Sequence, residues 1–446
     1  RAGQHGTPRA VSRATNWRLL FFVVPSASPH PVAAPVKAGS VTSRAGWLLV
    51  GMILVAAANL RTPLTAVGPV LDRLGEDLDL SPAALGALGA VPMLTFAVVS
   101  PLVHRLSRRL GMDRAVLVAM IALALGTALR SIPSIPVSLW TGTVLLAAAI
   151  AVANVLVPAI LKRDAPGNVP TLTGLYTSVM TAFAALASGV AVPLAIVGGW
   201  QLSLGIWAPF ALGAAAIWFV HVRKGSAARS SAPIVHAAPP VQRGSMWTSL
   251  VAWQVGLFMG MQSLCFYLLI TWLPSIEHSL GITPTVAGWH LFTMQVVGIG
   301  AGLVAGRLIA ARRSERGVGL VAGALMTTAM LGFTFAPALI WGWVALAGLA
   351  SGTNIVVALT LMSSRSRDSV DAGRLSGMAQ GVGYLLAALG PWGAGALYSA
   401  TGSWRPVLIV GALIGLGQAV LALSVGRAIF THGDPDPASN ERHCVV

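Results

Sequence analysis

The fold is decided by residues 47–71, WLLVGMILVAAANLRTPLTAVGPVL, which are apolar almost throughout. These 25 residues exceed the roughly 20 that an α-helix needs to cross the hydrocarbon core of a bilayer. The single charged residue, Arg61, lies roughly 21 Å from Trp47 along such a helix, past the midplane but within the hydrocarbon. Pro63 removes the backbone donor that would bond the carbonyl of Asn59. The stretch therefore predicts a membrane span with a polar point where the helix can unwind.

The charge on Arg61 limits where its side chain can lie. A guanidinium at this depth costs at least about 2.5–3.5 kcal/mol, and such residues usually face a bundle interior or a water-filled cavity. The alternative is that the side chain, with a reach of about 6–7 Å, extends to the outer interface. Four acidic residues follow there: Asp72, Glu76, Asp77 and Asp79. We favour the inward orientation, because the reach is short compared with the depth.

The composition excludes a soluble protein. Of the 446 residues, 55% are hydrophobic and 9% are charged, whereas soluble domains carry about 25% charged residues. The net charge of +16 comes from basic residues in short loops between apolar runs, so we expect no nucleic-acid partner. Cys265 and Cys444 imply no disulfide framework. No zinc site, phosphate-binding loop or dinucleotide fingerprint is present in the sequence, so we expect no metal and no cofactor.

Twelve apolar runs predict an all-α, polytopic membrane protein. They cover residues 47–71, 83–103, 114–132, 137–161, 171–197, 200–221, 247–274, 285–310, 317–337, 339–362, 375–400 and 404–429. The segment between the sixth and seventh runs is rich in Ser, Ala and Pro, which is typical of a flexible linker.

The domain organisation follows from this count. We expect two six-helix bundles, 45–222 and 247–430, joined by a cytoplasmic linker at 223–246. Residues 1–44 and 431–446 are expected to be disordered. The Arg-rich, acid-free start of the chain is also compatible with a transit peptide.

Basic residues predict the orientation in the membrane. If the N-terminus is cytoplasmic, 25 of the 29 Lys and Arg residues lie on the cytoplasmic side of the twelve spans. Because cytoplasmic loops carry an excess of Lys and Arg, we expect both termini in the cytoplasm and the chain in the inner (plasma) membrane.

The two halves of the chain repeat. Arg105 matches Arg307 at an offset of 202, Asn154 matches Asn354 at 200, and the segment 80–86 matches 282–288 at 202. An offset that stays near 200 across six spans indicates a duplicated six-helix unit, with the pseudo-symmetry axis along the membrane normal. In transporters built this way, the substrate site lies between the halves near the midplane.

Several motifs resemble known families. Residues 100–109, SPLVHRLSRR, resemble the Gly-x-x-x-Asp-Arg-x-Gly-Arg-Arg loop of major facilitator transporters, with a counterpart at 302–307; His104 and Gly306 replace the family's Asp. The resemblance implies a conformational role for three loop residues: Arg105, Arg109 and Arg307. The segments 59–63 (NLRTP), 271–274 (TWLP) and 375–384 (LSGMAQGVGY) resemble the cyanate and 2-nitroimidazole porters. That resemblance implies a small anionic or electron-poor solute moved by a secondary mechanism.

Ionisable residues within the predicted spans are few. Arg61, Arg130 and His290 lie there, and we expect no Asp or Glu deep in any span. A cavity whose fixed charge is Arg61, with no buried acid to neutralise it, attracts an anion. The candidate substrate-binding residues are Arg61, Asn59, Thr65, Asn154, Gln262, Asn354, Gln380 and Tyr384. His290 is a candidate for proton coupling, because imidazole titrates near neutral pH; a lone histidine is also a common packing residue.

These observations predict a secondary transporter that carries its solute by alternating access, with the two halves rocking against each other. We expect a monomer in the lipid bilayer with a small-molecule partner, and protons as a candidate coupling ion. One alternative is a proton-coupled multidrug exporter, although such exporters commonly carry buried acids. Another is a membrane solute sensor that does not transport. An enzyme would need a catalytic constellation at span depth, and the sequence shows none.

Overall fold

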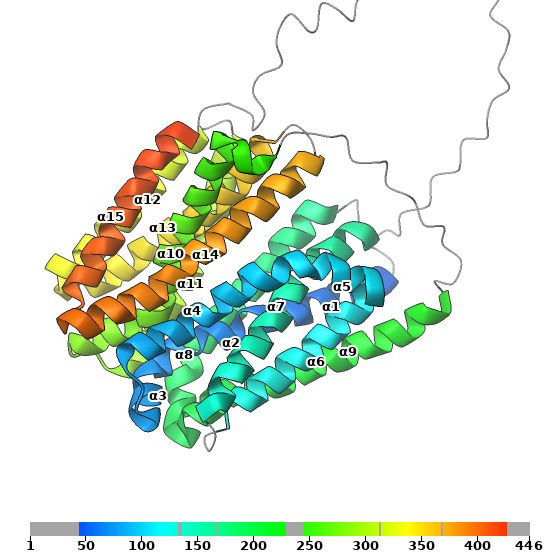
Figure 1. Cartoon of the computed structure of the whole chain (residues 1–446), viewed down its shortest axis with the longest axis horizontal. Coiled ribbons are helices and arrows are strands. Elements are labelled where there is room, and N and C mark those ends of the chain that lie inside the picture. Colours follow the sequence, from blue (N-terminus) through cyan, green and yellow to red (C-terminus); the bar gives the residue numbers. More distant parts are fainter. Residues whose placement is uncertain are drawn as a thin grey trace, which may run out of the picture. The chain divides into compact units, whose positions relative to one another are not determined.

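The computed structural model describes residues 44–132, 136–165, 168–228, 245–311, 314–366 and 369–425, all within one compact unit. Nearly all of the N-terminal segment expected to be disordered, most of the expected linker and all of the expected tail lie outside these ranges. Every regular element within them is helical, and Figure 1 shows two sets of long helices side by side.

The first half of the chain forms the first set. Its elements are α1 (Arg44–Leu60), α2 (Thr62–Thr65), η1 (Gly68–Val70), α3 (Leu71–Leu78), α4 (Pro82–Val99), η2 (Ser100–Leu102), α5 (Val103–Leu110), α6 (Met112–Arg130), α7 (Pro136–Asp164), α8 (Val169–Gly205) and α9 (Trp207–Ala228). The second half forms the other set. Its elements are η4 (Met246–Thr248), α10 (Leu250–Ser279), α11 (Pro284–Ala310), α12 (Glu315–Phe335), η5 (Pro337–Leu339), α13 (Ile340–Ser364), α14 (Ser369–Thr401) and α15 (Arg405–Val425).

The helices agree with the predicted number of spans. Ten stretches of the described residues are long and apolar enough to cross a membrane, and one of them, 171–223, contains two helices. Those two are separated at Gly198 and Gly199, where Gly199 has φ +70°, a conformation that favours glycine. The 33-residue α14 completes the twelve. The prediction of an all-α, polytopic membrane protein is therefore confirmed, and the bounds of the two bundles stay a prediction.

The first span is interrupted where the sequence predicts. α1 ends at Leu60, α2 begins at Thr62, and Arg61 lies between them. The hydroxyl of Thr62 donates to the carbonyl oxygen of Ala58, so a side chain satisfies an acceptor beside the break. Pro63, which lacks a backbone donor, occupies the first turn of the new helix, where that loss costs little.

Glycines allow the closest helix packing in the second set. The backbones of α11 and α13 approach so closely that a Cβ on Gly352 would overlap the carbonyl oxygen of Gly298. Gly300, two residues further along α11, has open space where its Cβ would be. The pair offers a matched test of backbone packing.

We expect Gly352→Ala to destabilise the protein and Gly300→Ala to leave it unchanged. The first substitution forces α13 away from α11, and overpacking of this kind typically costs about 1–3 kcal/mol. Thermal unfolding of the purified protein in detergent measures the difference. Equal midpoints for the two variants would show that α11 and α13 are not packed this closely.

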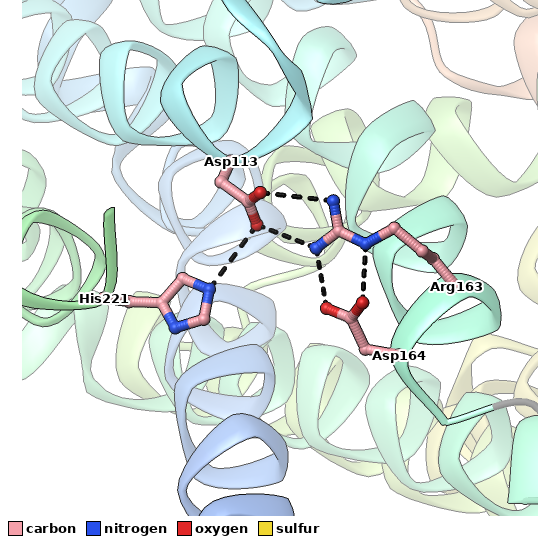
Figure 2. A network of polar contacts seen from close by, with 4 residues as sticks. All are labelled: Asp113, Arg163, Asp164 and His221. Atoms are coloured by element: carbon pink, nitrogen blue, oxygen red, sulfur yellow. Dashed lines mark hydrogen bonds and ion pairs between the residues drawn. The ribbon is translucent and has the colours of Figure 1, made fainter. Parts of the chain in front are cut away.

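A bidentate ion pair joins three helices at one end of the first set. The guanidinium of Arg163, in the last turn of α7, donates to both oxygens of Asp113 in the first turn of α6, at 3.0 and 3.2 Å. His221 of α9 places its Nε2 atom 3.5 Å from the same carboxylate, and Asp164 accepts from the other side of Arg163 (Figure 2). The network ties α6, α7 and α9 together.

The second set repeats this ion pair at an offset of 202 residues, from 113 to 315 and from 163 to 365. Arg365 places Nη2 2.7 Å from the carboxylate of Glu315, and its Nε donates to the carbonyl oxygen of Val425 in α15. The same three helices of each repeat are thus joined by an Arg at the same position. This supports the duplication predicted from shorter motifs.

Candidate functional site

The two sets of helices contact each other closely at one end, which we call the closed end. It comprises residues 65–89 of the first span and α4, 184–195 of α8, 270–295 of α10 and α11, and 390–399 of α14. Here the backbone of Ala83 donates to Ser399 Oγ, Gln295 donates to Ser188 Oγ, and Ser275 donates to Asp72. A Cβ on Gly86 would overlap the carbonyl oxygen of Pro391. No solute passes between helices packed at this distance.

Away from the closed end, Arg61 lies among three tyrosines. Its guanidinium carbon is 5.6 Å from the ring centroid of Phe266 in α10, within cation–π range. The hydroxyls of three tyrosines lie within electrostatic range of Arg61: Tyr176 in α8, Tyr267 in α10 and Tyr384 in α14. The whole chain has four tyrosines, so three of them lie near one guanidinium.

Asn154 completes this group, which we call the Arg61 site: Arg61, Asn154, Tyr176, Tyr267 and Tyr384. The hydroxyl of Tyr176 lies 3.4 Å from Asn154 Oδ1, so α7 also contributes. Both helix sets therefore supply side chains, and the guanidinium is half-buried. Within the described residues Arg61 forms no ion pair with a carboxylate, so its charge is left for another partner.

The remaining substrate-binding candidates have other partners. Asn59 donates to the carbonyl of Val55 at 2.8 Å, and Thr65 donates to the carbonyl of Ala184 at 2.8 Å, which joins the first span to α8. In the second set, Gln262 donates to Ser263 Oγ, Asn354 to Gln418 Oε1 and Gln380 to Ser376 Oγ. The structure thus brings Arg61, Asn154 and Tyr384 together and places the other five candidates in local hydrogen bonds.

The three loop arginines lie on the surface. Arg105 and Arg109 in α5 and Arg307 in α11 are exposed, and none forms an ion pair with the described residues. Arg163 and Arg365 form the ion pairs described above instead.

The expectation that no acid is buried in a span is wrong. Glu277 lies in the last turn of α10 and is 0% exposed, with Oε2 2.7 Å from Nδ1 of His290 in α11, itself 1% exposed. The sequence predicts that the seventh span ends at Pro274, but α10 continues through it to Ser279. Trp341 packs its ring edge-on against His290 at 4.0 Å. The second set therefore holds a buried acid–imidazole pair.

Comparisons with known proteins place the chain in a family. Residues 50–391 match the family model of the Major Facilitator Superfamily. The 2-nitroimidazole transporter of Escherichia coli (strain K12) is 37% identical over 390 residues, which cover 87% of this chain and 98% of that protein. The cyanate transport protein CynX of the same strain is 24% identical over 382 residues, 85% and 97% of the two chains.

The fold agrees with these matches. The crystal structure of a D-xylose-proton symporter superposes with a TM-score of 0.70 at 12% identity, covering 86% of this chain and 99% of the other. The chain belongs to the major facilitator superfamily, and within it to the cyanate and 2-nitroimidazole porters. It is a secondary transporter of small solutes and not an enzyme.

Proposed function

We propose that this transporter carries a small anionic or electron-poor solute across the cytoplasmic membrane, with Arg61 binding the negative part of the solute. The observation that carries the proposal is a half-buried guanidinium, shared between both helix sets, that has no carboxylate partner among the described residues. A buried cation that lacks a counter-ion is costly, and a solute that carries negative charge removes that cost.

The tyrosines give the site its selectivity in this proposal. A hydroxyl donates one hydrogen bond, so Tyr176, Tyr267 and Tyr384 together offer three donors around the guanidinium. Cyanate and the nitro group of a 2-nitroimidazole both present negative oxygen to such donors, and these are the solutes in the names of two relatives. An elongated or planar solute of a few heavy atoms fits this chemistry.

The same proposal accounts for the closed end. With both termini in the cytoplasm, as the distribution of Lys and Arg favours, the closed end faces outward. The structure then represents the state closed to the outside. Residues 45–222 rock against residues 247–430 within one monomer, and the contacts between Gly86 and Pro391 separate when the outside opens.

A proton is the coupling ion in this account. Glu277 and His290 form a buried pair whose outer atoms, Oε1 and Nε2, have no partner among the described residues. Intramembrane ionisable residues commonly serve as proton relays. The same pair favours a second candidate function, a proton-coupled exporter, because the argument against it was the apparent lack of a buried acid.

Uptake of radiolabelled cyanate into proteoliposomes tests the proposal. We expect saturable uptake above that of protein-free liposomes at neutral pH, and competition by other small anions but not by urea, a neutral molecule of similar size. Export from preloaded vesicles with no uptake favours the exporter. Tight cyanate binding without movement in either direction favours the sensor and contradicts the proposal.

A further inference from the structure

Arg130 is a second buried guanidinium that the Arg61 site does not use. It is the last residue of α6 and is 1% exposed. Its Nε and Nη2 atoms have no hydrogen-bond partner in the part of the chain that the structure describes. Buried polar groups in proteins are almost always paired, so an unpaired guanidinium points to a missing ligand.

Among the described residues, no carboxylate pairs with Arg130. Arg130 lies at the C-terminus of α6, where the helix dipole favours a cation, but that effect is small compared with the cost of burying an unpaired charge. The backbone of α7 is close: a Cβ on Gly142 would lie 2.5 Å from the backbone nitrogen of Arg130. This packing fixes the position of Arg130 without satisfying its side chain.

A cavity of about 40 Å³ lies beside the guanidinium, and Arg130, Thr143, Met93, Tyr267 and Thr271 are among its lining residues. One water needs about 10–15 Å³ of such space, so the cavity accommodates about three water-sized atoms. Among the described residues that line it there is no carboxylate. The hydroxyl of Thr143 already donates to the carbonyl of Leu139, so Arg130 is the principal donor.

The cavity lies between the closed end and the Arg61 site. Gly68, Gly89 and Thr271 line it and belong to the closed end, where a Cβ on Gly89 would lie 2.9 Å from Thr271. Tyr267 lines it from the other side and also belongs to the Arg61 site. A solute that moves between the closed end and Arg61 therefore passes this cavity.

We propose that Arg130 and its cavity form a second binding site for a small inorganic anion of about three heavy atoms. The site is separate from the Arg61 site and is occluded in this state. This proposal extends the proposed function. The statement that the transported solute also binds at Arg130 on its way rests on that proposed function. Anion binding at Arg130 follows from the cavity and the unpaired guanidinium alone.

Binding stoichiometry of the purified full chain tests this proposal. The probe is radiolabelled thiocyanate, a linear anion of three heavy atoms, in equilibrium dialysis. We expect two sites in the wild type, one in Arg130→Gln, one in Arg61→Gln and none in the double variant. Arg130→Lys keeps the charge but loses the planar fork, so we expect two sites, one of them about tenfold weaker.

A cavity-filling variant is a second test that does not depend on whether Arg130→Gln folds. Thr143→Leu leaves Arg130 in place but occupies its cavity, and we expect it to lose one of the two sites. One wild-type site that only Arg61→Gln removes would overturn the proposal and leave the proposed function intact. One site that only Arg130→Gln and Thr143→Leu remove would support it and contradict the role of Arg61. Two sites retained in both Arg130→Gln and Thr143→Leu, or none in the wild type, would overturn it.

Discussion

Arg61→Gln is expected to lower saturable cyanate uptake about 10- to 100-fold. Glutamine keeps hydrogen-bonding capacity but removes the charge that lies near the three tyrosine hydroxyls. A hydrogen bond to a charged group contributes about 1.5–3 kcal/mol, and every 1.4 kcal/mol changes a binding constant roughly tenfold. The loss should appear mainly in the affinity for the solute, since the helix break at Arg61 does not depend on its side chain.

Initial uptake rates over a range of cyanate concentrations measure this effect. Arg405→Gln is the matched control, because Arg405 is an exposed arginine at the start of α15 and should transport as the wild type does. Arg61→Lys should retain part of the affinity, because it keeps the charge without the planar fork. Wild-type affinity in Arg61→Gln would remove Arg61 from the site.

Glu277→Ala and His290→Ala are each expected to destabilise the protein by about 3–5 kcal/mol. Each leaves one member of a fully buried pair without its 2.7 Å partner. Replacing both residues by Leu removes both charges at once, so the double variant should recover most of the lost stability. His278→Ala is the control: it lies next to Glu277 in sequence, and its pair with Asp72 is well exposed, so the expected change is at most about 1 kcal/mol.

Thermal unfolding in detergent gives the stability of these four variants, and uptake driven by an imposed proton gradient gives the coupling. In the proposed mechanism the Leu double variant is folded but no longer responds to the gradient. A double variant that is stable and responds as the wild type does would show that the pair serves packing alone. A single variant as stable as His278→Ala would contradict the buried pair itself.

The break in the first span was predictable because its causes are local. Pro63 lacks a backbone donor whatever the fold, and a charge at the depth of Arg61 needs a polar environment in any bundle. The duplication was also predictable from the sequence, because matching motifs recur at an offset near 200 residues. Asp113 and Glu315 also match at this offset. Only the structure shows that they form ion pairs with Arg163 and Arg365.

Glu277 was missed because helix ends depend on tertiary packing. Pro274 is a normal signal for the end of a helix, yet α10 tolerates it and carries Glu277 one turn further into contact with His290. Proline persists inside membrane helices when neighbouring groups satisfy the freed carbonyl. Sequence alone does not show which prolines have such neighbours.

Of the three tyrosines near Arg61, Tyr384 was a candidate from the sequence, whereas Tyr176 and Tyr267 were missed for a different reason. Tyr176, Tyr267 and Tyr384 lie on three helices from both halves of the chain, and no periodicity or spacing links them. The one available signal was the small number of tyrosines. The chain has four in 446 residues, so each of them could have been named as a functional candidate. Asn59 and Thr65 show the opposite case, because their proximity to Arg61 in sequence does not place their donors toward it.

The central claim is that Arg61 binds the negative part of the solute, and selenocyanate tests it most directly. Anomalous diffraction from crystals of the wild-type protein grown with this anion locates the selenium atom. The account predicts a peak at the Arg61 site, with the anion in hydrogen-bonding contact with the guanidinium and with at least one of Tyr176, Tyr267 and Tyr384. Protein that transports cyanate but shows no anion density at Arg61 would contradict it.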